Sequence, residues 1–203
     1  MLEHFRRFLV RSRPTVRRHD NSSVLNVEHL EPRSLPSATL ISNIHAGGSS
    51  MPQNLVSFGG YVYFSADDGI HGRELWRTDG TAAGTQLVAD VATGSASADP
   101  QMFTPLGSWL YFTAYRADVG VELWRTNGTI TELVQDINPG TASSNPTELT
   151  EVSGTLFFAA HRDGEGTELW QTTGTGATLV KDIVIGLQSS APSLLTNVQG
   201  VLY

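Results

Sequence analysis

The stretch Glu74–Val91 reads ELWRTDGTAAGTQLVADV, and its first three residues return twice further along the chain. Glu-Leu-Trp stands at Glu74–Trp76, Glu122–Trp124 and Glu168–Trp170, so successive copies are 48 and 46 residues apart. Other landmarks keep this register: Gly80, Gly128 and Gly174; Thr81, Thr129 and Thr175; Asp90, Asp136 and Asp182, with Asn43 in the first copy; and Pro52, Pro100, Pro146 and Pro192. A fixed period of this length predicts a repeat architecture.

The apolar pattern within each copy predicts short strands separated by turn-forming residues. In the third copy we expect strands at Glu132–Ile137, Glu148–Val152, Thr155–Ala160 and Thr167–Thr172. The strand at Thr155–Ala160 and its equivalents contain three adjacent apolar residues, which indicates that both of their faces are buried. The Glu-Leu-Trp strand alternates instead, so Glu74 and Trp76 share one face and Leu75 lies on the other.

Four-stranded units of about 46 residues predict an all-β, propeller-like array. We expect three complete units plus one partial unit, because the fourth unit ends at Tyr203 in mid-strand. A closed propeller has about four to eight blades, so we expect an incomplete propeller with an unfinished C-terminal edge through which the chain self-associates. The alternative is an open, solenoid-like stack of sheets.

Charge divides the chain into two parts. The net charge is −7, but residues 1–35 hold seven Arg and four acidic residues, so this segment carries +3 and the remainder −10. We therefore predict a basic, disordered, targeting-like segment at residues 1–39, followed by the repeat domain at residues 40–203. An acidic repeat domain disfavours nucleic acid as a partner. No apolar run approaches the roughly 18 residues that a transmembrane helix needs.

The three copies ELWRTDGT, ELWRTNGT and ELWQTTGT, with the LVADV, LVQDI and LVKDI runs that follow them, resemble the ELWxxDGT repeat family over residues 40–203. Members look like large exported bacterial proteins with propeller-like or related β arrays, and the resemblance implies no general enzymatic activity. The stretch Val27–Ala38 (VEHLEPRSLPSA) resembles an N-terminal motif common in planctomycete proteins that look destined for export or the cell surface. Together the resemblances imply an extracellular or cell-surface protein.

The repeated residues themselves are predicted to be structural. We expect the three Trp to pack between units, with a stacked aromatic ligand site as the alternative, and each neighbouring Glu to make a repeated structural bond. Catalytic groups normally occur once per site, whereas this Glu occurs in every unit. Asn127 and Thr173 replace Asp79 of the first copy, so we expect a turn role at this position rather than a ligand that needs Asp in every copy.

Acidic loops after the apolar strands are the only cofactor candidates. Asp67, Asp68 and Asp163 lie in Gly-containing loops, whose carboxylates are the oxygen ligands that calcium prefers. The alternative is an ordinary solvated turn, since acidic residues before Gly are common turn formers. The histidines of the repeats, His45 and His71 among them, occupy non-equivalent positions, so no shared histidine site is expected.

No nucleophile elbow, phosphate loop or metalloprotease motif is present in the sequence. We therefore predict a non-enzymatic surface or secreted β-repeat scaffold that binds a protein or a glycan through loops between strands. Two alternatives remain: a fragment of a propeller-type hydrolase, and a truncated product without independent activity.

Overall fold

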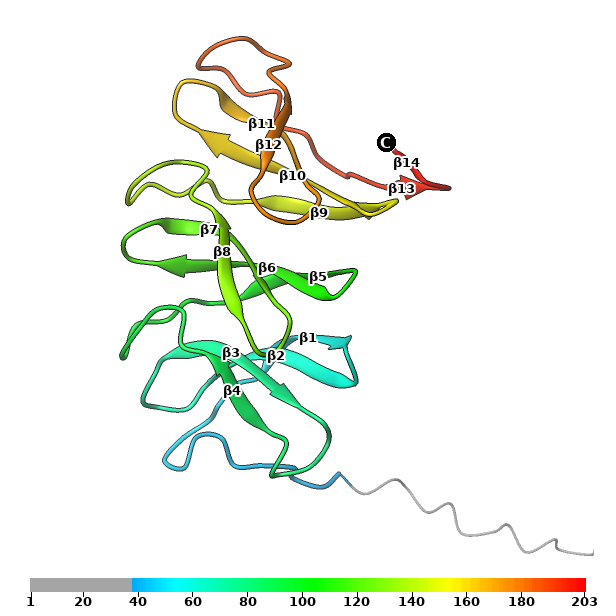
Figure 1. The fold of residues 1–203 in the computed structure, drawn as a ribbon. Helices are drawn as coiled ribbons and strands as arrows, with labels where there is room; N and C mark the ends of the chain where they lie inside the picture. The colour runs from blue at the N-terminus through cyan, green and yellow to red at the C-terminus, as the bar shows by residue number, and fades with distance from the viewer. Residues whose placement is uncertain (1–37) are drawn as a thin grey trace, which may run out of the picture. The chain divides into compact units, whose positions relative to one another are not determined.

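Residues 38–203 are the part of the chain that the computed structural model describes, and all their regular structure is β (Figure 1). Residues Thr39–Tyr203 form one compact unit. The predicted N-terminal segment lies outside the described residues, apart from its last two positions. Within residues 38–203 there is no helix of the length and hydrophobicity that a membrane span requires.

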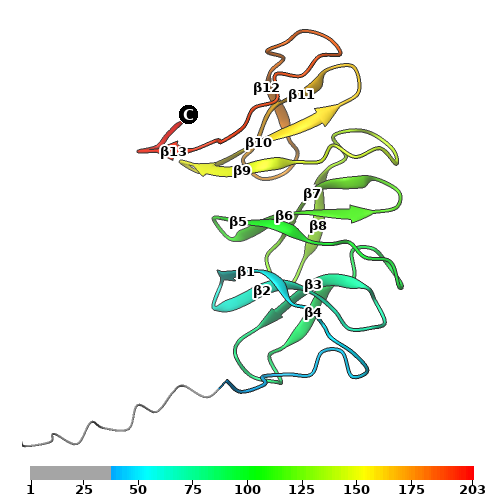
Figure 2. The same ribbon diagram turned by 180° about the vertical axis from the view of Figure 1, so that it is seen from behind.

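Three four-stranded antiparallel sheets and a two-stranded hairpin follow one another along the chain (Figures 1 and 2). The first sheet comprises β1 (Gln53–Phe58), β2 (Tyr61–Asp67), β3 (Arg73–Thr78) and β4 (Gln86–Ala89). The second comprises β5 (Gln101–Leu106), β6 (Trp109–Arg116), β7 (Gly120–Thr126) and β8 (Thr131–Gln135). The third comprises β9 (Thr147–Val152), β10 (Thr155–Arg162), β11 (Gly166–Thr172) and β12 (Thr178–Lys181), and the hairpin comprises β13 (Asn197–Val198) and β14 (Val201–Leu202).

The sequence-based grouping of strands into units is wrong by one strand. We expected Glu132–Ile137 to belong with the strands that follow it, but β8 pairs with β7 and completes the second sheet. The turn between β7 and β8 is short, and such a turn favours an antiparallel hairpin between the strands that it joins. A longer linker then leads from each completed sheet to the next, so each sheet is an independent meander.

Apolar residues between neighbouring sheets form the core. Leu75 and Tyr63 of the first sheet are buried in one cluster with Phe112 and Trp124 of the second. A second cluster joins the second and third sheets, and its members include Tyr111, Leu123, Phe158 and Trp170. The first sheet has a smaller cluster on its other face: Phe64, Ala66 and Trp76, with Ile44 and Leu87 packed against them. The predicted packing of the repeated Trp between units is therefore confirmed for Trp124 and Trp170.

Equivalent irregularities recur in the three four-stranded sheets. The first strand of each sheet contains a register shift against the second strand, typical of a β-bulge. At this bulge a residue other than Gly adopts a positive φ: 56° at Asn54, 55° at Met102 and 59° at Glu148. The first strands of neighbouring sheets also contact one another, since β5 touches both β1 and β9, while β13 touches β9.

The structure confirms an all-β protein of repeated four-stranded units. It contains no helix in residues 38–203, and its sheets are antiparallel meanders. No ring of sheets closes within the described residues, so the propeller-like arrangement remains a prediction.

Candidate functional site

The repeated glutamate anchors the linker that follows its own sheet. The carboxylate of Glu74 accepts hydrogen bonds from the backbone N–H groups of Val91 (2.8 Å), Ala92 (3.2 Å) and Ala98 (3.1 Å). Glu74 lies at the start of β3, and its side chain is fully buried. The linker is irregular and does not pair with a strand. Buried backbone N–H groups need acceptors, and the Glu74 carboxylate supplies them.

The same contacts recur in the other two units. Glu122 accepts hydrogen bonds from the N–H groups of Ile137 (3.2 Å) and Ser144 (2.8 Å), and from the hydroxyl of Ser144. Glu168 accepts bonds from the equivalent residues of its own linker, with N–H donors at 3.0 and 2.8 Å. The predicted structural bond of the repeated Glu is confirmed, and its partner is the linker backbone.

A glycine two residues before each Glu lets the linker approach closely. A Cβ atom built at Gly120 would lie 2.7 Å from the carbonyl oxygen of Ala142, so a larger residue does not fit without a shift. Beside it, the Ser143 hydroxyl accepts a hydrogen bond from the N–H of Val121 at 2.9 Å. The same glycine–serine pair recurs at Gly72 with Ser97 and at Gly166 with Ser189. Gly, Glu and Ser together therefore fasten each linker to its sheet.

The three glutamates differ in their pKa. Burial raises the pKa of Glu74 to about 7, and it also raises the pKa of Glu122. Burial acts in the same direction on Glu168, but hydrogen bonds from Ser190 and from the linker backbone outweigh it, so the pKa of Glu168 is lowered. The linkers beyond Glu74 and Glu122 are covered by the next sheet, whereas no described sheet covers the linker beyond Glu168.

The turn that follows each Trp behaves largely as predicted. The Asp79 carboxylate accepts hydrogen bonds from the N–H and hydroxyl of Thr81, at 2.9 and 2.7 Å. Asn127 uses its side-chain oxygen in the same way, accepting from the N–H of Thr129 at 2.9 Å. In each unit a threonine hydroxyl also caps the turn glycine: Thr78 with Gly80, Thr126 with Gly128 and Thr172 with Gly174. The turn role is confirmed for Asp79 and Asn127.

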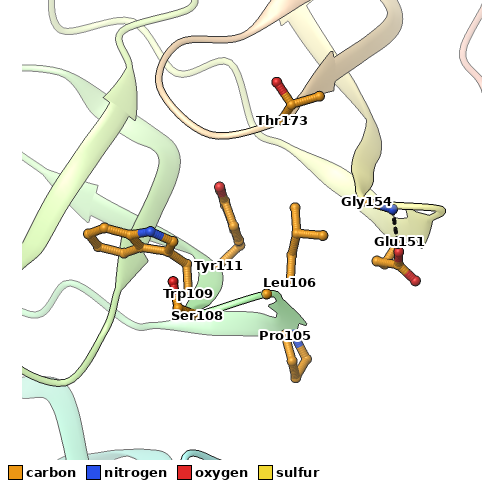
Figure 3. Close-up of a pocket in the computed structure, with 9 residues that line it drawn as sticks. Pro105, Leu106, Ser108, Trp109, Tyr111, Glu151, Gly154 and Thr173 are labelled. Atoms are coloured by element: carbon orange, nitrogen blue, oxygen red, sulfur yellow. Dashed lines mark hydrogen bonds between the residues drawn. The ribbon is translucent and has the colours of Figure 1, made fainter.

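A groove between the second and third sheets is the best candidate for ligand binding (Figure 3). Its volume is about 580 Å³. One wall is the β5–β6 hairpin, which contributes Leu106, Trp109 and Tyr111, and the opposite side is formed by Glu151 and Thr173. The groove thus combines aromatic and aliphatic surface with a carboxylate and a hydroxyl, which is the usual composition of a small-molecule site.

Trp109 is held in place by charged neighbours. The guanidinium of Arg125 lies 4.0 Å from the centre of the Trp109 ring, a cation–π contact. Arg125 in turn hydrogen-bonds to Glu132, with 2.8 Å between the Arg125 Nε and the carboxylate. Arg125 is itself almost fully buried. These contacts restrain the half-buried indole and so pre-form one wall of the groove.

The acidic loop residues close their own turns. Asp67 accepts a hydrogen bond from the N–H of Gly69 at 2.6 Å. Asp68 accepts bonds from the amides of Ile70 and His71, both at 2.8 Å, and pairs with the His71 ring at 2.7 Å. Burial acts to raise the pKa of Asp68, but the bonds from His71 and the backbone outweigh it and lower this pKa to about 2.

Asp163, the third calcium candidate, lies in a different sheet from Asp67 and Asp68. It is 3.3 Å from the His161 ring, and its N–H donates to the side chain of Asn138. Within residues 38–203, no three or more His, Asp or Glu side chains form a group that could hold a metal ion. The three candidates therefore do not come together, and calcium binding remains a prediction.

The groove was not predicted from the sequence, because Trp109 is not one of the repeated residues. Trp109 is the one Trp outside the Glu-Leu-Trp motif, and its equivalents are Tyr61 and Thr155. Tyr61 also has an arginine over its ring, since Arg77 lies 4.4 Å from the ring centre. The available signal was an aromatic residue diagonal to an arginine on the neighbouring strand, two positions from Tyr111, which pairs directly with Arg125.

The fold and the groove define this chain as an all-β protein of tandem four-stranded units with a cleft between two of them. No protein-family model matches the chain, and no curated protein matches it either. Among solved structures, the chain is similar to a computationally designed protein, Ika4, at 16% sequence identity and a TM-score of 0.42. That similarity covers 75% of this chain and 83% of the designed one.

Proposed function

We propose that this protein is a non-enzymatic, extracellular or cell-surface β-repeat scaffold that binds glycans in the groove between its second and third sheets. The observation that supports the proposal is the position of Trp109, a half-buried indole restrained by Arg125 at the wall of an open groove. Exposed, restrained aromatic rings are favourable binding surfaces because they lose little conformational entropy when a ligand binds.

The chemistry of the groove favours a carbohydrate. Sugar rings present C–H faces that pack on aromatic surfaces, and hydroxyl groups that donate to carboxylates. Trp109 offers the aromatic surface, while Glu151 stands across the groove as an acceptor. One oxygen of the Glu151 carboxylate already accepts a bond from Gly154 N–H at 2.8 Å, which fixes its orientation. Placement outside the cell is supported by the resemblance of Val27–Ala38 to an export-associated motif.

The hydrogen bonds that the buried glutamates accept support a binding role rather than catalysis. A general acid or base must reach the substrate proton through a hydrogen bond. Glu74, Glu122 and Glu168 are instead fully buried and accept bonds from their own linkers. These three buried acids thus serve the repeat structure.

Glycan-array binding by the full chain tests this proposal. We expect Trp109→Ala to lower affinity for the bound glycan by about tenfold or more, as is usual when a Trp at the centre of a contact is truncated. Tyr61→Ala is the matched control, since Tyr61 occupies the equivalent position under Arg77 but does not line the groove. Circular dichroism establishes that both variants fold. Absence of glycan binding by the wild-type chain, or equal losses in both variants, would refute the proposal.

A further inference from the structure

The bulge in the first strand of each sheet carries a different side chain. In the first sheet, the Asn54 side chain donates a hydrogen bond to the carbonyl oxygen of Pro100 at 3.2 Å. In the third sheet, the Glu148 carboxylate accepts a hydrogen bond from the N–H of Leu195 at 3.2 Å. The second sheet has Met102 at this position, and it is 43% exposed. A thioether is only a weak acceptor, so Met102 cannot replace these polar contacts.

A second position in the same sheet shows the same change from polar to apolar. Tyr115, near the end of β6, is 39% exposed, and its equivalents are Asp67 and His161. Each equivalent side chain makes a polar contact in its own loop, Asp67 with the N–H of Gly69 and His161 with the carboxylate of Asp163. Exposed apolar side chains that gather at one place mark interaction sites more often than exposed ones that are scattered singly.

Met102 and Tyr115 line one groove of about 530 Å³, which we call the Met102 groove. Val121 adds apolar surface, and residues 145–147, which lead into β9, form another part of the lining. The Met102 groove lies where β5 begins and β6 ends, whereas the groove at Trp109 lies at the hairpin that joins these strands (Figure 1). The two grooves are therefore separate sites on the same sheet.

The charge of the Met102 groove favours a cation. Within residues 38–203, Asp99 is the only charged residue that lines this groove. Its side chain is 56% exposed, and its Oδ1 atom lies 3.5 Å from the Nε of Arg73, which is mostly buried. Arg73 thus helps to hold the Asp99 carboxylate in place and leaves the second oxygen able to accept a hydrogen bond. The chain beyond residue 35 carries a net charge of −10, which also attracts cations.

We propose that the Met102 groove binds an arginine side chain of a peptide partner. The planar guanidinium stacks on the Tyr115 ring and donates hydrogen bonds to Asp99, while its aliphatic stem packs on Met102. Guanidinium groups combine stacking on aromatic faces with hydrogen bonds to carboxylates, and they are more weakly hydrated than ammonium groups, so arginine fits this groove better than lysine. Methionine adapts its shape to the packed stem. The site is independent of the proposed glycan groove.

Methyl NMR of the full chain tests the proposal directly. The chain has three methionines, Met1, Met51 and Met102, so a sample labelled at the methionine methyl groups gives few resonances. Met102→Asn, which installs the residue of the first sheet, identifies the Met102 resonance by its loss. The probe is the peptide Gly-Ser-Arg-Ser-Gly, blocked at both ends and added to millimolar concentration. We expect it to shift the Met102 resonance saturably and to leave that of Met51 unchanged, because Met51 does not line the groove.

The same peptide with citrulline in place of arginine separates charge from shape. Citrulline keeps the planar end group and the stem but is neutral, so we expect its binding to be about tenfold weaker or more. Equal binding of the two peptides would show that the groove takes a neutral group, and it would overturn the proposal. An unshifted Met102 resonance with the arginine peptide would overturn it as well.

Two matched variants locate the charge contact. Asp99→Asn should weaken binding of the arginine peptide by about tenfold, since a hydrogen bond to a charged group is lost. Asp118→Asn is the control, because Asp118 is also an exposed aspartate paired with an arginine, Arg116, but does not line the Met102 groove. Both variants change the net charge equally, so equal affinities would refute the role of Asp99.

Tyr115→Ala tests the stacking contact with the same resonance. We expect a loss of about tenfold or more in affinity, as is usual for an aromatic anchor. Circular dichroism of each variant checks that the fold is kept. A Tyr115→Ala chain that is folded and binds the arginine peptide as tightly as the wild type would overturn the proposed site.

Discussion

The second and third sheets carry the same residue types at equivalent positions, but only the second has another complete sheet packed beyond it. Leu123 is fully buried, whereas its equivalent Leu169 is half-buried. In the linkers that follow, 1% of Ile137 is exposed against 52% of Ile183. The burial of a repeat residue is therefore set by the neighbouring unit as much as by its own strand, as expected for arrays stabilised by nearest-neighbour interfaces.

The largest expected effect concerns the linker anchors. Glu122→Ala leaves two amides and one hydroxyl without their acceptor beneath a covered linker, and each unpaired buried donor costs about 1–3 kcal/mol. We expect a total loss of about 4 kcal/mol in the free energy of unfolding. Glu168→Ala removes the same contacts beneath an uncovered linker, where water can replace the carboxylate, so we expect a loss of about 1 kcal/mol.

Urea denaturation followed by circular dichroism measures both losses on the full chain. Thr129→Ala is a suitable control, since Thr129 lies in an exposed turn. Equal losses for the two glutamate variants would show that covering the linker does not strengthen its anchor. That result would refute the inference that the neighbouring sheet strengthens the contacts between the glutamate and its linker.

The repeat register predicted most of the strands because the apolar runs are short and bounded by turn formers. It failed at β8, where the run Glu132–Ile137 was joined to the following strands rather than to β7. The connection lengths held the answer, since four residues separate β7 from β8 and eleven separate β8 from β9. The shorter connection favours the hairpin.

The anchors were predictable only in part. The repetition of Glu122 predicted a structural role. Its hydrogen bonds with the linker could not be predicted, because they depend on the three-dimensional path of that linker. Gly120 and Ser143 also repeat in register, but the close contact between them depends on the path of the linker, which the sequence does not show. The position of Trp109 in the groove depends on how two sheets pack, which no periodicity within one strand reveals.

A smaller difference is expected for the apolar core. Leu123→Ala opens a cavity between two sheets and should cost about 3 kcal/mol, within the usual range for a buried Leu. Leu169→Ala truncates a half-buried side chain and should cost about 1 kcal/mol, because solvent already reaches part of it. Denaturation midpoints of the two variants measure the difference. A loss at Leu169 as large as at Leu123 would mean that another surface covers the third sheet in solution.

The smallest expected effect is a difference in how stability changes with pH. It follows from the opposite pKa shifts of Glu122 and Glu168. The pKa of Glu122 is raised above the ordinary value of 4.5, so its contribution to stability is fully present below pH 4.5 and is lost as pH rises through the folded-state pKa. The pKa of Glu168 is lowered, so its contribution is present above pH 4.5 and is lost as pH falls below that value.

Replacement by Gln removes each titration while keeping the side-chain shape. The cost of Glu122→Gln in unfolding free energy should therefore shrink as pH rises from about 4.5 to about 8, whereas the cost of Glu168→Gln should stay level there and shrink only in acid. Urea midpoints of both variants and the wild type across this range give the two slopes. Parallel slopes would show that the neighbouring sheet does not set the protonation of the repeated glutamate.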